Sequence, residues 1–256
     1  MTQFEEGSGG GLLVRSTAEG AALLRAAGHL LGDPAVRGPD DLAGRLVAPG
    51  LGAAGLVKLP LVRRLLPTLI EAVIPGGVWF EVARTRGFDD LVREEVARGA
   101  EQVVILGAGL DSRAYRMAGE LAGTRVFEVD HPVTAAYKRE RVARVVGEPP
   151  ENVTYVEVDF EREALDDALT AAGHDPAVHS IVVWSGVTPY LDDDAVTATL
   201  DWFAGQAPGS TIGFDYVWRE LLEGALSADR GRAGRVARIV ARHGEPFRWG
   251  IPRGGT

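Results

Sequence analysis

Glycine and acidic residues stand at the ends of three short apolar runs in the middle of the sequence. They are Gly107 and Gly109 after QVVIL, Asp130 at the end of RVFEVD, and Asp159 with Phe160 after VTYVEV. Glycine lets a backbone turn sharply and approach a ligand closely. A carboxylate about 20 residues further on can accept hydrogen bonds from both ribose hydroxyls of a nucleoside. Together these residues predict a crevice that binds adenosine.

Each of these residues also has a plain structural explanation. A tight turn from a strand into a helix requires glycine whether or not a ligand binds there. Asp130 could cap the helix that begins HPVTAAYK, and Asp159 could cap FEREALDDAL. Capping and binding do not exclude each other, so the prediction depends on the three strand ends occurring together.

The charge of the first turn favours a ligand without phosphate. A dinucleotide fingerprint has a third small residue where Ser112 stands, and it needs a helix N-terminus free to receive a diphosphate. Asp111 occupies that N-terminus with its own carboxylate, so a diphosphate would meet like charge. S-adenosylmethionine carries a cationic sulfonium and a zwitterionic amino-acid end instead. The turn therefore favours a sulfonium nucleoside over NAD and disfavours an NAD-dependent oxidoreductase.

The elements that must position these residues alternate between strand and helix over the second half of the chain. Short Val and Ile runs separated by helical segments are typical of parallel strands covered by helices on both faces. The expected strands are 102–108, 125–130, 153–159, 180–187 and 210–217. The expected helices are 112–120, 132–146, 161–172, 192–205 and 218–243. We predict a doubly wound α/β fold.

The first hundred residues show helical rather than strand patterns. Ser16 and Glu19 form a capping box at the start of a first helix. A second helix is expected within 38–50, a third within 59–77 with a break at Pro67, and a fourth over 78–99 that ends at Gly99. We expect residues 1–15 to be disordered, 16–98 to form a helical lid and acceptor layer, and 99–256 to form the α/β domain, in one structural unit with the lid.

Composition limits the classes of partner. The formal net charge of −9 argues against a nucleic-acid surface, and the absence of cysteine excludes disulfides and thiolate metal sites. The acidic, glycine-rich N-terminus does not resemble a signal peptide, and charged residues interrupt the most apolar window, 56–77. The spacing of the five histidines does not suggest a metal site. We expect a cytoplasmic protein without a membrane segment.

Five motifs in this order carry a family resemblance: ARTRGFDDLV, EQVVILGAGLDSRAYR, VFEVDHP, YVEVDF and VVWSGVTPYLDDDAV. The chain resembles the actinobacterial S-adenosylmethionine-dependent methyltransferases related to leucine carboxyl methyltransferases, over roughly residues 16–250. The resemblance implies a class I methyltransferase fold with S-adenosylmethionine as the methyl donor. By position, it implies that Arg84 binds the carboxylate of the cofactor and that Gly107 lies under its methionine portion. Asp130 would hold the ribose, and Asp159 with Phe160 would flank the adenine.

Three positions in the fourth apolar segment concern the site of methyl transfer, one on the cofactor side and two on the acceptor side. Ser185 stands where the family usually has a glutamate near the charged part of the cofactor, so one ionised anchor is lost. Pro189 replaces a bulkier residue, which would reshape the wall above the reacting methyl group. Tyr190 matches a family position that faces the substrate, although it could equally be a buried aromatic residue with a polar tip.

The end of the chain departs from the family as well. Family members continue into a final antiparallel strand pair, which here is shortened or missing, so the strand 210–217 would be an edge with unpaired backbone groups. We expect either a partner subunit, as in a homodimer, or the segment 245–252 to cover this edge.

The sequence therefore predicts an O-methyltransferase that acts on a carboxylate or hydroxyl of a small molecule. A carboxylate acceptor needs no general base, whereas a hydroxyl would need one, and no histidine paired with an acid stands out for this role. The alternative is a protein that keeps the fold but has lost methylation and has a binding role.

Overall fold

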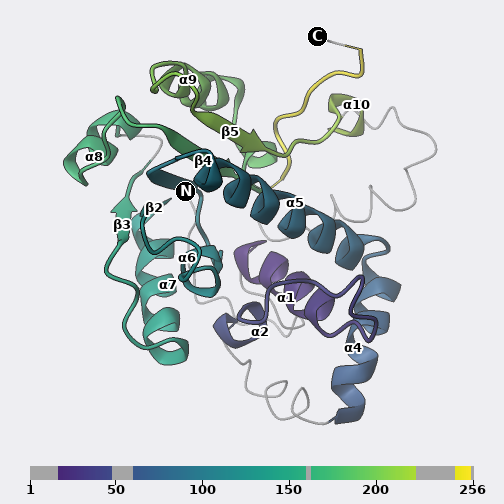
Figure 1. Cartoon of the computed structure of the whole chain (residues 1–256). Coiled ribbons are helices and arrows are strands. Elements are labelled where there is room, and N and C mark those ends of the chain that lie inside the picture. The colour runs from purple at the N-terminus through teal and green to yellow at the C-terminus, as the bar shows by residue number, and fades with distance from the viewer. Residues whose placement is uncertain (1–16, 48–59, 160–162, 223–245, 255–256) are drawn as a thin grey trace.

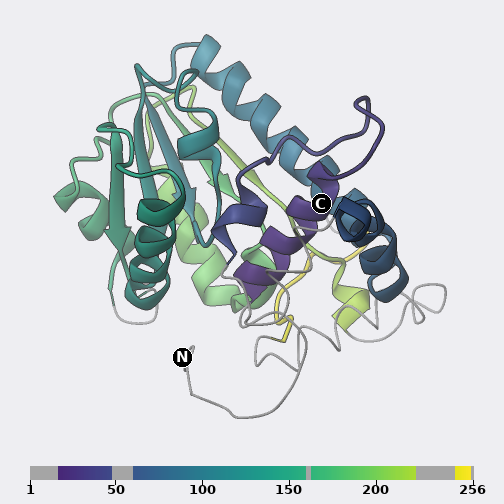
Figure 2. The same cartoon turned by 90° about the horizontal axis from the view of Figure 1, so that it is seen from below.

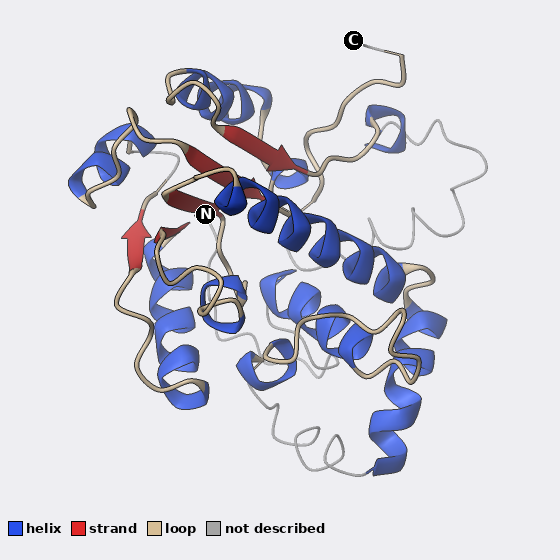
Figure 3. Ribbon diagram, in the orientation of Figure 1, coloured by secondary structure: helices blue, strands red, loops and turns tan. Residues whose placement is uncertain are grey.

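The computed structural model describes residues 17–47, 60–159, 163–222 and 246–254. Its centre is a parallel five-stranded sheet with the strand order β3-β2-β1-β4-β5 (Figures 1 and 3). The strands are β1 (Gln102–Leu106), β2 (Arg125–Asp130), β3 (Val153–Glu157), β4 (Ser180–Trp184) and β5 (Thr211–Phe214). The strand order reverses between β1 and β4, and ligands of such sheets bind outside the carboxyl ends of the strands at this point. The predicted doubly wound fold is confirmed.

Alternate residues of the strands pack against two separate helical layers. Val103 and Ile105 of β1 lie in one core with α5 (Gly77–Ala97), α6 (Arg113–Arg116) and α7 (Pro132–Val145). Val104 and Leu106 lie in the other core with α8 (Leu165–Ala171) and α9 (Asp193–Ala204). Because β1 and β4 are buried on both faces, their sequences after the first residues, Gln102 and Ser180, are continuous apolar runs without a polar alternation.

Three described helices precede α5 in the chain. They are α1 (Thr17–His29), α2 (Ala43–Leu46) and α4 (Pro60–Val73), and Figure 2 shows α1 and α4 together beside the sheet. Helices α1 and α4 pack against α5, whereas α2 packs against α1 and α7. Helix α5 ends as predicted, because Gly99 takes a φ of 97° and donates its N–H to Val96, while Ala100 donates to Glu95. That these helices form a lid stays a prediction. Ser16 and residues 1–15 lie outside the described residues, so the capping box and the expected disorder do as well.

The predicted break at Pro67 is wrong, because α4 continues through this residue. A proline inside a helix removes one backbone hydrogen bond. Pro67 is buried here, and the loss of that bond does not end the helix. The chain bends instead at Gly76, where φ is 85° and where α4 from Arg64 meets α5 at 107°. Both oxygens of Glu71 fix this corner, since they accept the N–H groups of Gly76 and Val78 at 2.7 and 2.9 Å.

Among the described helices, none is by itself long and apolar enough to cross a membrane; only α4 and α5, joined across their bend, would reach that length and composition.

The described C-terminal segment runs beside the chain just beyond β5. Ile251 donates its N–H to Val217 at 3.0 Å, and Arg219 donates to Ile251 at 2.9 Å. The segment therefore pairs with the continuation of β5 and not with Thr211–Phe214 itself. Coverage of that edge by a partner subunit stays a prediction. The expected helix 218–243 is described only as α10 (Arg219–Leu222), and residues 223–245 lie outside the described part.

Candidate functional site

The predicted glycine turn follows β1 directly at the reversal of strand order. Gly107 and Gly109 have φ angles of 62° and 41°, a region that L side chains rarely adopt. A Cβ atom on Gly107 would lie 2.3 Å from Cγ2 of Val187, in the loop after β4. Glycine at position 107 therefore makes room for a neighbouring side chain, which is a reason that the sequence alone did not reveal.

Asp130 ends β2 and binds the glycine turn. One carboxylate oxygen accepts the N–H of Gly109 at 2.5 Å, and the other accepts the N–H of His131 at 2.7 Å. Burial raises the pKa of Asp130, and the two backbone N–H groups partly offset that effect. The alternative role of Asp130 as the cap of α7 is wrong, because His131 is the N-cap and its side chain accepts the N–H of Val133. Asp130 therefore lies at the end of β2, as predicted, and its carboxylate links this strand to the glycine turn after β1.

Arg84 of α5 reaches the loops after β4 and β5. It donates to Oδ2 of Asp215 at 2.8 Å and to Oε1 of Glu81 at 2.5 Å. Burial alone would lower the pKa of Arg84, but the two carboxylates outweigh it and raise that pKa above its ordinary value. A Cβ atom on Gly186 would lie 2.8 Å from Nη1 of Arg84, so glycine allows the guanidinium to lie directly against the β4 loop.

The negative charge of Asp111 is compensated by a neighbouring cation, which the sequence did not lead us to expect. Its Oδ1 accepts the N–H of Arg113 at 2.8 Å, as expected of a residue at the start of α6. Its Oδ2 is also paired with the guanidinium of Arg113. Burial alone would raise the pKa of Asp111, but Arg113, Lys138 and Arg25 hold it well below its usual range. We expected this turn to repel a diphosphate because Asp111 would carry an unpaired negative charge. That premise is wrong, since Arg113 already neutralises the carboxylate.

The remaining predicted residues lie at the ends of β3 and β4. Asp159 follows β3, and its backbone N–H donates to Glu163 at 2.9 Å. As described, α8 starts at Leu165 with Ala164 as its N-cap. The residues directly after Asp159, 160–162, lie outside the described part, so its alternative role as the cap of the stretch that starts there stays a prediction. Phe160 lies outside the described residues. Ser185 is the first residue after β4 and adjoins Gly186.

Tyr190 belongs to the 3-10 turn η1 (Thr188–Tyr190) after β4. Its ring lies 5.4 Å from that of Phe247, centroid to centroid. The carbonyl oxygen of Pro189 accepts the N–H groups of Arg248 and Trp249 at 2.6 and 3.2 Å. The C-terminal segment therefore holds the turn that carries the predicted substrate-side residue.

Three residues of the site were missed by sequence reasoning. Glu81 lies one helical turn before Arg84, a spacing at which charged side chains pair. Asp215 follows β5, and so occupies the same kind of strand-terminal position as Asp130 and Asp159. That position was a signal that could have revealed it. Val187 carried no signal, because only the tertiary structure places it over Gly107.

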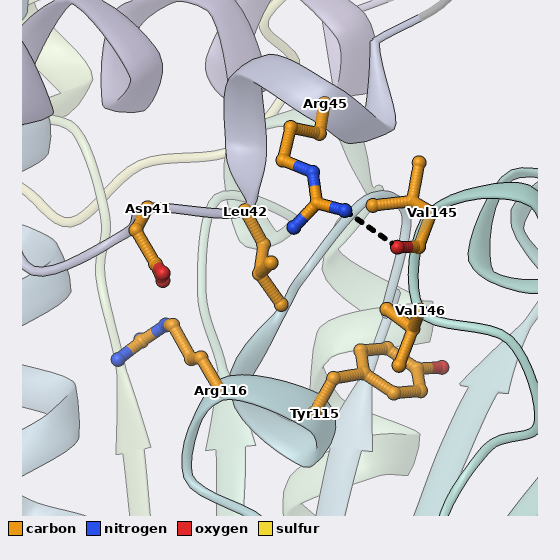
Figure 4. A pocket seen from close by; sticks show the side chains of 7 residues that line it. All are labelled: Asp41, Leu42, Arg45, Tyr115, Arg116, Val145 and Val146. Atoms are coloured by element: carbon orange, nitrogen blue, oxygen red, sulfur yellow. Dashed lines mark hydrogen bonds between the residues drawn. The ribbon is translucent and has the colours of Figure 1, made fainter.

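A hollow of about 360 Å³ lies on another part of the surface (Figure 4). Its walls come from α2, α6 and the end of α7, and are formed by Asp41, Leu42, Arg45, Tyr115, Arg116, Val145 and Val146. Arg45 donates to the carbonyl oxygen of Val145 at 2.7 Å across it. None of the predicted site residues lines this hollow, so we do not assign the nucleoside to it.

Residues 21–204 match the family model of leucine carboxyl methyltransferases. The chain belongs to this family. A relative in Streptomyces coelicolor, named "Putative S-adenosyl-L-methionine-dependent methyltransferase", is 43% identical over 145 residues, which are 56% of this chain and 50% of that protein. A relative of the same name in Mycobacterium avium is 33% identical over 191 residues, 74% of this chain and 59% of that protein. The chain thus spans between 50% and 59% of the length of these two relatives.

Solved structures agree on the fold. A crystal structure from Thermobifida fusca, described as a "putative methyltransferase", superposes with a TM-score of 0.54 at 18% identity. The match covers 88% of this chain and 74% of that one. The predicted family resemblance and the class I methyltransferase fold are therefore both confirmed.

Proposed function

We propose that this chain is an S-adenosylmethionine-dependent O-methyltransferase that acts on a carboxylate or hydroxyl of a small molecule. The proposal rests on the membership of the chain in the leucine carboxyl methyltransferase family and on how three features are placed at one end of its sheet. The glycine turn, Asp130 and Arg84 converge on the carboxyl ends of β1, β2 and β4, where parallel sheets bind their ligands.

The residues at the strand ends suit the chemistry of this cofactor. Asp130 retains acceptor capacity for ribose hydroxyls, since each carboxylate oxygen has two lone pairs and the described bonds use one on each. Arg84 has five N–H donors, and its two described bonds use two of them. A guanidinium can bind a carboxylate through two parallel N–H groups. Asp159 and Phe160 are proposed to flank the adenine.

When bound, the cofactor supplies a methyl group on a sulfonium leaving group, so the protein mainly aligns the reactants and excludes water. Holding donor and acceptor in a near-attack geometry lowers the barrier by about 7–11 kcal/mol. We assign Tyr190 to the acceptor, because its turn adjoins β4 and is held by residues 247–249. A carboxylate acceptor would need only positioning by such a residue.

Two measurements test this proposal. Calorimetry should detect binding of S-adenosylmethionine, and incubation with methyl-labelled cofactor should transfer label to a carboxylic acid or hydroxyl compound in an extract. Protein that binds no S-adenosylmethionine at millimolar concentration would contradict the proposal. A titration with NADH, followed by nicotinamide fluorescence, serves as the comparison for an NAD-dependent oxidoreductase.

A binding protein without methylation is the second candidate. Ser185 favours it, because the family resemblance implies a carboxylate near the charged part of the cofactor at this position, and serine has none. If the parent chain failed to bind the cofactor and Ser185→Glu created binding, this second candidate would be preferred.

A further inference from the structure

Glu81 has a buried carboxylate oxygen that the described residues leave unsatisfied. The residue is only 4% exposed and lies on α5, one turn before Arg84. Its Oε1 accepts a hydrogen bond from Nη2 of Arg84 at 2.5 Å. Its Oε2 is buried and has no hydrogen-bond partner among the described residues. A buried acceptor without a donor is costly, so such an atom indicates a missing partner.

The cluster around Glu81 also has an excess of negative charge. Glu81 and Asp215 share the single guanidinium of Arg84. The second oxygen of Asp215 accepts the N–H of Gly186 at 2.5 Å, which leaves Glu81 as the less satisfied acid. Within the described part of the chain, no other cationic side chain forms an ion pair with either carboxylate. A charged ligand group is therefore expected to complete the cluster.

The position of the cluster relates it to the strand-end site. Asp215 follows β5, Gly186 follows β4, and the guanidinium of Arg84 lies against Gly186. These loops adjoin Gly107 through Val187. The unsatisfied oxygen thus belongs to the same end of the sheet as the glycine turn.

We propose that Oε2 of Glu81 binds the α-ammonium group of the cofactor, beside the carboxylate contact of Arg84. This inference rests on the proposed function. The ammonium fits better than the sulfonium, because an unsatisfied lone pair needs an N–H donor and a sulfonium has none. Arg84 and Glu81 together then present a cation and an anion to the two ends of one zwitterion. Glu81 is thereby a cofactor-binding residue that the sequence motifs do not indicate.

The test compares ligands that differ only in the amino-acid end. S-adenosylhomocysteine has both ammonium and carboxylate, S-adenosyl-3-thiopropylamine keeps the ammonium alone, and 5′-methylthioadenosine has neither. Each is titrated by calorimetry into the wild type, Glu81→Gln and Glu94→Gln. The last variant makes the same change at an exposed position of the same helix. Glutamine retains an acceptor for Arg84, and thermal unfolding without ligand checks that each variant is folded.

We expect Glu81→Gln to lower the affinity for S-adenosylhomocysteine and for S-adenosyl-3-thiopropylamine by about 10- to 150-fold. This range corresponds to the usual strength of a hydrogen bond to a charged group. Binding of 5′-methylthioadenosine should be unchanged, and Glu94→Gln should match the wild type for all three ligands. The thiopropylamine is decisive, because a residue that acted only by positioning Arg84 would not affect a ligand without a carboxylate.

Two results would overturn the inference alone. One is unchanged affinity of Glu81→Gln for the thiopropylamine, and the other is an equal loss for 5′-methylthioadenosine, which has no ammonium. In both cases the wild type still binds nucleosides, and the proposed function stands. A wild type that binds none of the three ligands would overturn both proposals.

Discussion

Asp130 shows how one carboxylate can serve both structure and binding. It accepts the N–H groups of Gly109 and His131, and so joins the turn after β1 to the end of β2. Asp130→Asn would keep the size of the side chain but would place an amide donor opposite one of these N–H groups. We expect a loss of unfolding free energy of about 1–3 kcal/mol and a loss of cofactor affinity of about tenfold or more.

Chemical denaturation and calorimetry check these two effects of Asp130→Asn separately. Glu140→Gln is the control, because Glu140 is more than half exposed in its pair with Arg144. Unchanged cofactor affinity in a destabilised Asp130→Asn would restrict Asp130 to a structural role.

Gly107 and Val187 form the second contact that can be tested at the scale of residues. Gly107→Ala must place a Cβ atom 2.3 Å from Cγ2 of Val187 and must also hold a positive φ. Gly173→Ala holds a φ of 91° as well, but its Cβ atom would meet nothing within 4 Å. We expect Gly107→Ala to cost about 1–3 kcal/mol more than Gly173→Ala, the usual cost of overpacking.

A double-mutant cycle isolates this clash. Adding Val187→Ala to Gly107→Ala should recover most of the excess loss in urea denaturation. If the double variant is as unstable as the sum of the two single variants, then Val187 is not the reason for glycine at position 107.

At the scale of elements, Asp89 connects α5 to α6. Its buried carboxylate accepts a hydrogen bond from Nε of Arg113 at 2.9 Å. It also accepts hydrogen bonds from two guanidinium nitrogens of Arg116 at 2.6 and 2.5 Å. Burial alone would lower the pKa of Arg116, and Asp89 raises it above its ordinary value. Helix α6 has only four residues, so these ion pairs rather than its own hydrogen bonds hold the turn after β1 against α5.

Asp89→Asn should therefore destabilise the fold by about 3–5 kcal/mol. It leaves the buried guanidinium of Arg116 without a carboxylate partner and that of Arg113 with Asp111 alone. The neighbouring Asp90→Asn is a matched control, since Asp90 is 66% exposed and pairs with the exposed Arg93. It should cost about 1 kcal/mol or less. Equal losses for the two variants in urea denaturation would show that Asp89 does not connect the helices in this way.

At the scale of the whole molecule, His174 links stability to pH. It is 3% exposed, and its ring lies between Phe127 of β2 and Trp202 of α9, at centroid distances of 5.5 and 5.9 Å. Neither ring nitrogen has a hydrogen-bond partner among the described residues. Burial, followed by the charge of Arg125, lowers the pKa of His174 below its ordinary value. The unfolded chain therefore binds a proton at this residue more readily than the folded one.

The free energy of unfolding should consequently fall as the pH drops through about 6.5, the value for an unfolded histidine, towards the lower pKa of the folded state. His174→Phe removes this proton linkage and keeps an aromatic ring in the core. We expect it to be near neutral at pH 7.5 and to lose less stability than the wild type between pH 7 and pH 5. Parallel pH profiles of the two proteins in urea denaturation would contradict this assignment.

The sequence by itself determined the order of elements and the strand-terminal positions of the site. Short Val and Ile runs predicted all five strands, and β2 has the predicted bounds. The clearest runs belong to β1 and β4, which are buried over their full length. The five runs placed Asp130 and Asp159 at strand ends, whereas Ser185 was expected within the strand 180–187 and lies just after β4. The five motifs were specific enough to indicate the family that the comparison then confirmed.

The tertiary structure decided which charges are compensated, since this depends on contacts between residues far apart in the chain. Arg113 neutralises Asp111, and Asp215 reaches Arg84 across 131 positions. Local patterns describe one helix or strand at a time, whereas the charge of a buried site is the sum over several elements that pack together. For this reason the unsatisfied oxygen of Glu81 was visible only after α5 was packed against the ends of β4 and β5.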